Sequence, residues 1–101
     1  MIRFLIRYDI EEAHLDEIRE AVAAFVRYID GHDELDMSYQ SLKSEEGFHF
    51  THIATFRDES HLKALQGSEA FKTFSGVIKK CAVNPPAASR MTLIGATQKT
   101  F

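Results

Sequence analysis

The order of the patterned segments along the chain constrains its fold more than any other feature of the sequence. Stretches in which apolar and polar residues alternate indicate strands, and stretches with apolar residues at helical spacing indicate helices. Their order is strand, helix, strand, strand, helix, strand, which is a split βαβ unit repeated once, the ferredoxin-like plait. We expect strands at residues 2–10, 35–41, 48–56 and 90–97, and helical segments at 11–28, 58–66 and 69–81.

Local signals set the ends of these segments. Gly31 is a helix stop, and residues 44–47 (Ser-Glu-Glu-Gly) indicate a turn that joins two strands into a hairpin. Gly67 interrupts the second helical region, and Ser68 has the character of an N-cap for the segment that follows it. Asn84-Pro85-Pro86 ends that segment. We therefore expect an α+β fold with a four-stranded antiparallel sheet and two helical regions on one face.

Size and composition exclude several classes of protein. With 101 residues the chain is expected to form a single domain, residues 1–101, and its net charge of −3 gives no basic footprint for nucleic acid. One cysteine, Cys81, allows neither an intramolecular disulfide nor a zinc site of several thiolates. The sequence contains no signal-peptide pattern and no long apolar run, so we expect a cytoplasmic protein without membrane contact.

Both faces of the expected sheet carry apolar residues. Leu5 and Ile53 alternate with the sets Phe4/Ile6 and Phe50/Phe56, so they belong to the opposite face. Two helical regions on one side leave that second face open, and an apolar open face is an interaction surface. We expect a homodimer in which two such sheets pack against each other.

The chain resembles the antibiotic-biosynthesis-monooxygenase-like superfamily of dimeric α+β barrels over nearly its whole length. The resemblance rests on the acidic helix start after the first strand, on Gly31, and on two passages: Ile53-Ala54-Thr55-Phe56-Arg57-Asp58-Glu59-Ser60-His61-Leu62 and Gly67-Ser68-Glu69-Ala70-Phe71-Lys72-Thr73-Phe74. It implies a dimeric barrel fold. The superfamily includes oxygenases, haem-degrading enzymes and members without known activity, so the resemblance leaves the chemistry open.

The oxygenases of this superfamily use no cofactor and act on planar phenols or quinols. A polar side chain helps to deprotonate the substrate, whose anion then reduces oxygen directly. Family members often carry an asparagine four residues before a tryptophan, and the matching positions here are His52 and Phe56. The resemblance therefore implies a cofactor-independent monooxygenase in which His52, with a reference pKa near 6.5, acts as the catalytic base.

Alternation along the third strand places Phe50, His52, Ala54 and Phe56 on one face. Tyr8 and Tyr39 join this face if their strands point the same way. From the helix side, Phe71 and Phe74 are expected to close a cavity that binds a small aromatic molecule. The alternative interpretation is that His52 is a hydrogen-bonded core histidine and that the aromatic residues are simply core.

Two other functions remain open. One is a non-catalytic ligand-binding or accessory dimer, which the missing tryptophan and asparagine favour. The other is haem degradation, in which a histidine on a helix ligates the iron. His61 is the candidate for this ligand, and we also count it among the expected substrate-binding residues. The sequence has no tryptophan, the residue that distorts the haem in such enzymes. We expect no metal site, because His49 and His52 lie three residues apart on a strand and point to opposite faces.

Overall fold

The computed structural model describes residues 1–99 and 101 and has the expected βαββαβ order. Two single 3-10 turns, Glu12–His14 and Asp33–Leu35, precede the first helix and the second strand. The remaining elements are β1 (Ile2–Asp9), α1 (Leu15–Asp30), β2 (Met37–Lys43), β3 (His49–Phe56), α2 (Glu59–Gln66), α3 (Glu69–Cys81) and β4 (Ala87–Met91).

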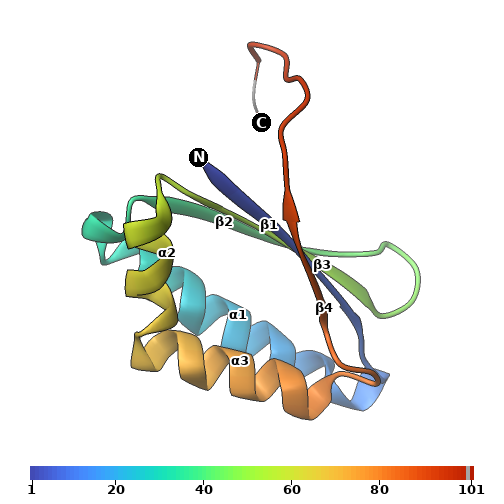
Figure 1. The fold of residues 1–101 in the computed structure, drawn as a ribbon. Helices are drawn as coiled ribbons and strands as arrows, with labels where there is room; N and C mark the ends of the chain where they lie inside the picture. The colour runs from blue at the N-terminus through green and yellow to red at the C-terminus, as the bar shows by residue number, and fades with distance from the viewer. Residues whose placement is uncertain (100) are drawn as a thin grey trace.

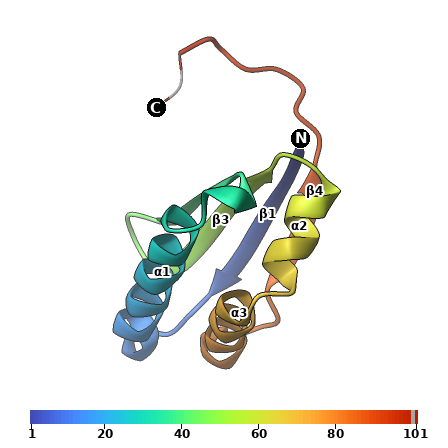
Figure 2. The ribbon, with the colours of Figure 1, turned by 90° about the vertical axis from the view of Figure 1, so that its left-hand side faces the viewer.

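The strands form one sheet in the order β2-β3-β1-β4, and every neighbouring pair is antiparallel. All three α-helices lie on one side of this sheet, with α1 and α3 running side by side and α2 near one end (Figure 1; Figure 2). No helix within the described residues is long and apolar enough to cross a membrane. The expected α+β, ferredoxin-like class is confirmed.

The local signals for the second helical region are confirmed in atomic detail. The Asp58 carboxylate accepts hydrogen bonds from the backbone N–H groups of Ser60 and His61, which caps α2. The Ser68 hydroxyl accepts from the N–H of Phe71 and caps α3. Gly67 stands between the two caps, so the second helical region consists of two helices that meet at an angle.

The core lies between the sheet and the helices. Along β3 the side chains of Phe50, His52, Ala54 and Phe56 are buried, while the residues between them are half-buried. From the helices, Ile18, Phe25, Phe74 and Ile78 pack against this face together with other apolar side chains. The predicted two-sided character of β3 is confirmed.

The prediction for the last strand is wrong in its position. We expected residues 90–97, but β4 covers Ala87–Met91 and pairs with residues 3–7 of β1. The apolar pattern of Met91, Leu93 and Ile94 indicated a strand, whereas Ala87, Ala88 and Ser89 have little intrinsic strand preference. The available edge of β1 decides the pairing, because strand formation depends on the partner more than on propensity.

Candidate functional site

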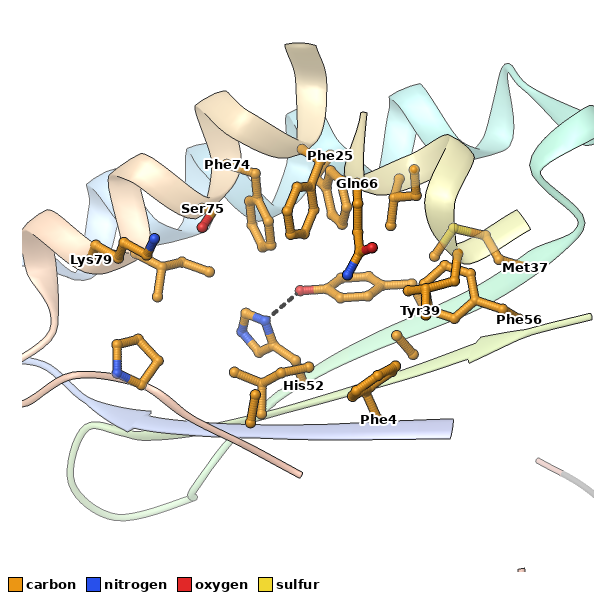
Figure 3. A pocket seen from close by; sticks show the side chains of 18 residues that line it. Phe4, Phe25, Met37, Tyr39, His52, Phe56, Gln66, Phe74, Ser75 and Lys79 are labelled. Atoms are coloured by element: carbon orange, nitrogen blue, oxygen red, sulfur yellow. Dashed lines mark hydrogen bonds between the residues drawn. The ribbon is translucent and has the colours of Figure 1, made fainter. Parts of the chain in front are cut away.

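A buried histidine between two tyrosines forms the polar centre of the helix-covered face. His52 is 1% exposed. Its Nε2 lies 2.8 Å from the Tyr8 hydroxyl oxygen and its Nδ1 lies 2.6 Å from the Tyr39 hydroxyl oxygen. Figure 3 shows the contact with Tyr39 as a dashed line. The imidazole therefore has both ring nitrogens in hydrogen bonds within the chain.

The register of the sheet brings these three residues together. Ile6 of β1 and Ser41 of β2 stand directly opposite His52 on either side. Tyr8 lies two residues beyond Ile6, and Tyr39 lies two residues before Ser41, so both share the face of His52. These are diagonal neighbours, which long aromatic side chains can reach. A shift of one residue in either pairing would turn a tyrosine to the other face.

A cavity of about 290 Å³ lies between this face of the sheet and the helices. The ligand sites of proteins begin near ~300 Å³, and an apolar cavity of ~150 Å³ already holds benzene. The cavity therefore has room for about two fused rings. Figure 3 shows the lining side chains; in full they are Phe4, Ile6, Phe25, Met37, Tyr39, His52, Ala54, Phe56, Leu62, Leu65, Gln66, Phe71, Phe74, Ser75, Ile78, Lys79, Pro86 and Ala88.

Aromatic contacts hold the imidazole in place. The Phe74 ring from α3 stacks over His52 with centroids 5.7 Å apart, and Phe25 from α1 stacks on Phe74 at 4.1 Å. Tyr39 meets Phe25 edge-on at 5.2 Å. On the other side of His52, Tyr8 stacks on Phe50 at 5.4 Å. The imidazole is therefore packed between aromatic rings from the helices and from the sheet.

Burial sets the protonation states of the three polar groups. Desolvation lowers the pKa of His52 to about 4, so its imidazole is neutral at pH 7. Burial likewise raises the pKa of Tyr8 and of Tyr39, and both hydroxyls stay protonated. At neutral pH the three hydrogen-bonded groups Tyr8, His52 and Tyr39 are therefore uncharged.

A neutral imidazole has one N–H and one lone pair, so one tyrosine donates to it and the other accepts. When Tyr39 donates to Nδ1, the Tyr39 oxygen keeps lone pairs that can accept from a ligand hydroxyl. When Nδ1–H donates to Tyr39, the Tyr39 O–H is free to donate to a ligand. Tyr39 can thus present either a hydrogen-bond acceptor or a hydrogen-bond donor to a ligand in the cavity. Which of the two it presents depends on where the protons lie along Tyr8, His52 and Tyr39.

The structure places five of the eight residues named from the sequence at the cavity wall: Tyr39, His52, Phe56, Phe71 and Phe74. Tyr8 and Phe50 lie in the core next to His52 without lining the cavity. His61 is not among the lining residues, and its Nδ1 lies 2.7 Å from a carboxylate oxygen of Asp58.

Sequence reasoning did not name the other polar residues of the lining. Gln66, Ser75 and Lys79 come from the end of α2 and from α3. Ser75 and Lys79 follow Phe71 at intervals of four, so helical spacing places them on the same face. That periodicity was the available signal for both. Gln66 lies just before the break at Gly67 and had no comparable signal.

The sequence model described as antibiotic biosynthesis monooxygenase matches residues 1–76. No curated protein matches the chain.

Among solved structures, the chain is similar to Rv0793 from Mycobacterium tuberculosis, with 14% identity over 96% of this chain and 98% of that one and a TM-score of 0.81. A dimeric ferredoxin-like protein of unknown function from Jannaschia sp. has 16% identity over 91% and 98% of the chains, with a TM-score of 0.74. A mutant of SnoaB, a cofactor-independent oxygenase from Streptomyces nogalater, has 11% identity over 97% of each chain and a TM-score of 0.78. At these identities the likeness shows a shared fold.

Proposed function

Because the chain belongs to the antibiotic biosynthesis monooxygenase family, we propose that it is a cofactor-independent monooxygenase acting on a planar phenol or quinol. The observation that carries the proposal is the Tyr39–His52 pair on the wall of a mostly apolar cavity. SnoaB, which shares the fold, is described as a cofactor-independent oxygenase, and this supports the same reaction class.

The chain's own residues supply a path for one proton. A substrate hydroxyl that donates to the Tyr39 oxygen can lose its proton while Tyr39 passes its own to Nδ1 of His52. The resulting imidazolium keeps its Nε2–H on the Tyr8 oxygen, 2.8 Å away. The low pKa of His52 makes it a weak base on its own, but the substrate anion forming beside it stabilises the imidazolium. Proton transfer and anion formation are therefore coupled.

The oxidation itself needs only the substrate anion and oxygen. The anion of a reduced polycyclic phenol gives electrons to O₂ and forms a C–O bond, and the hydroperoxide then loses water to leave a quinone. One oxygen atom ends in the product and the other in water, and the substrate supplies all the electrons. The protein's part is to bind and orient the ring, to exclude water and to hold the proton.

We propose further that the chain forms a homodimer through the open face of the sheet. Leu5 and Ile53 stand opposite each other at the centre of that face, and none of the helices in the described part of the chain covers it. Leu42 and Met91 are each 48% exposed. The related fold from Jannaschia sp. is described as dimeric. A second copy would cover these apolar side chains.

A non-catalytic ligand-binding protein is the second candidate, and one observation favours it. Among the described residues, no buried side-chain nitrogen or oxygen lacks a hydrogen-bond partner. The site is therefore satisfied without a ligand, as expected of a core histidine. The haem-degrading alternative has no comparable support, because its candidate iron ligand, His61, is bonded to Asp58 and does not line the cavity.

Two measurements separate these candidates. Thermal unfolding in the presence of anthrones and naphthoquinols tests binding: a ligand at a hundred times its Kd adds ~2.7 kcal/mol, which raises the Tm of a domain of this size on the order of ten degrees. Oxygen uptake with the compounds that bind then tests catalysis. Uptake that His52→Gln and Tyr39→Phe both reduce supports the monooxygenase, and binding without uptake supports the non-catalytic protein.

A further inference from the structure

A second group of polar side chains lies at the other end of the helical layer. The first residues of α1 meet the last residues of α3 there (Figure 1). The Nδ1 of His14 lies 3.4 Å from Oε1 of Glu17, and Nζ of Lys80 lies 2.8 Å from Oε2 of the same carboxylate. One imidazole nitrogen, one Glu17 oxygen and the Cys81 sulfur all lie within 4.8 Å of one another. None of these residues lines the cavity described above.

We propose that His14, Glu17 and Cys81 bind a zinc ion, which the sequence did not indicate. A thiolate, an imidazole and a carboxylate are the ligand types that zinc takes in proteins, and a thiolate disfavours calcium and magnesium. This inference does not depend on the proposed oxygenase function.

The distances fit a tetrahedral ion with little movement. Zinc bonds of about 2.0–2.3 Å place neighbouring ligand atoms about 3.3–3.6 Å apart. The His14–Glu17 distance of 3.4 Å already has this value. Because no pair of ligand atoms is more than 4.8 Å apart, side-chain rotation has to bring any pair closer by at most ~1.5 Å. The His14 and Glu17 side chains are 39% and 36% exposed, which leaves the fourth position to water.

The ion pair with Lys80 uses one oxygen of the Glu17 carboxylate. Nζ of Lys80 lies 2.8 Å from Oε2, whereas Nδ1 of His14 lies 3.4 Å from Oε1. The two contacts therefore fall on different oxygens, and Oε1 is the oxygen placed to share a metal ion with His14. Zinc binds the thiolate form of cysteine, so binding would release the Cys81 proton.

Cobalt is the probe for this site, because Co²⁺ substitutes for Zn²⁺ and its absorption reports the ligands. Titration of the full chain with Co²⁺ should give one equivalent of binding, with tetrahedral d–d bands in the visible and a thiolate-to-cobalt band in the near ultraviolet. Zn²⁺ should then displace the cobalt. Cys81→Ser should remove the thiolate band, and His14→Ala and Glu17→Gln should each weaken the affinity by at least ~10-fold.

The matched control is His49→Gln. His49 also forms a pair with a carboxylate, 2.6 Å from Asp9, but it has no thiol beside it, and its replacement should leave the cobalt spectrum unchanged. Absence of the thiolate band in the unaltered chain would overturn the proposal. Undiminished affinity in both His14→Ala and Glu17→Gln would overturn it too, because the thiol would then bind alone. Both of these positions are partly exposed, so the test holds even if Cys81→Ser does not fold.

Discussion

The two faces of the sheet have the same alternating pattern but very different surroundings. On β3, Phe50, His52, Ala54 and Phe56 point toward the helices and are buried, and the polar groups among them are hydrogen-bonded. The alternate residues Thr51, Ile53 and Thr55 point to the open face and stay half-buried. Alternation therefore identifies two faces, and only the position of the helices decides which of them becomes a closed site.

The two faces also differ in the surroundings of their histidines. Burial on the helix side lowers the pKa of His52 and leaves a neutral imidazole between two hydroxyls. His49, of the same residue type and only three positions away, lies on the opposite face, exposed and paired with Asp9. The first three predictions below pair a change on the helix side of the sheet with a change on the open face, which serves as the control.

The largest effect is expected from Tyr39→Phe. The change removes the hydroxyl that connects the cavity to His52, so oxygen uptake with a phenolic substrate should fall by about 10²–10⁴-fold, the range for loss of acid–base assistance. The neighbouring change Gln40→Ala on the open face should leave uptake within about twofold. Equal losses in the two variants would contradict a specific role for Tyr39.

The second-largest effect is expected on stability, from the loss of packing in the aromatic cluster around His52. Phe74 is 7% exposed and stacks on both Phe25 and His52, so Phe74→Ala should lower the free energy of unfolding by about 3–5 kcal/mol. Leu42→Ala on the open face, where the side chain is 48% exposed, should cost less than about 1 kcal/mol. Urea denaturation at low protein concentration measures both. Similar costs would mean that the two faces are equally covered.

The predictions for Tyr39 and Phe74 depend on features of the fold, some of which the sequence alone predicted. It predicted the βαββαβ order, the cap at Ser68 and the shared face of Phe50, His52, Ala54 and Phe56 in β3, because each depends on local pattern. The position of β4 was missed because its pairing depends on the edge of β1, and the paired residues lie 80 to 88 positions apart in the chain. The meeting of His14 with Cys81 depends in the same way on how two helices pack.

The pH dependence of stability should show the buried histidine. Unfolded His52 titrates near pH 6.5 and folded His52 near 4, so the unfolded state binds more protons between these values. Stability should therefore fall by about 3 kcal/mol as the pH is lowered from 6.5 to 4. His52→Gln should abolish this loss, and His49→Gln should retain it. Urea denaturation at a series of pH values measures the slope, and a flat profile in the unaltered protein would contradict burial of His52.

The smallest effect on the fold, and the sharpest test of the open face, is expected from Ile53→Lys. In a single copy this substitution should change stability by about 0.5 kcal/mol, because the side chain faces outward. In the proposed homodimer it would place charges at the centre of the interface, so light scattering should show a dimer for the unaltered chain and a monomer for the variant. A monomeric unaltered chain at micromolar concentration would rule out the sheet-to-sheet dimer.

The most direct test of the central claim is a nitrogen NMR spectrum of the histidine side chains, with and without a naphthol as a phenolic ligand that resists oxidation. We expect His52 to be neutral at pH 7 and to be the one imidazole of the five whose nitrogen signals shift as the ligand binds. Shifts at His61 instead, or an unmoved His52 with the ligand bound, would contradict the assignment of the Tyr8–His52–Tyr39 cavity as the functional site.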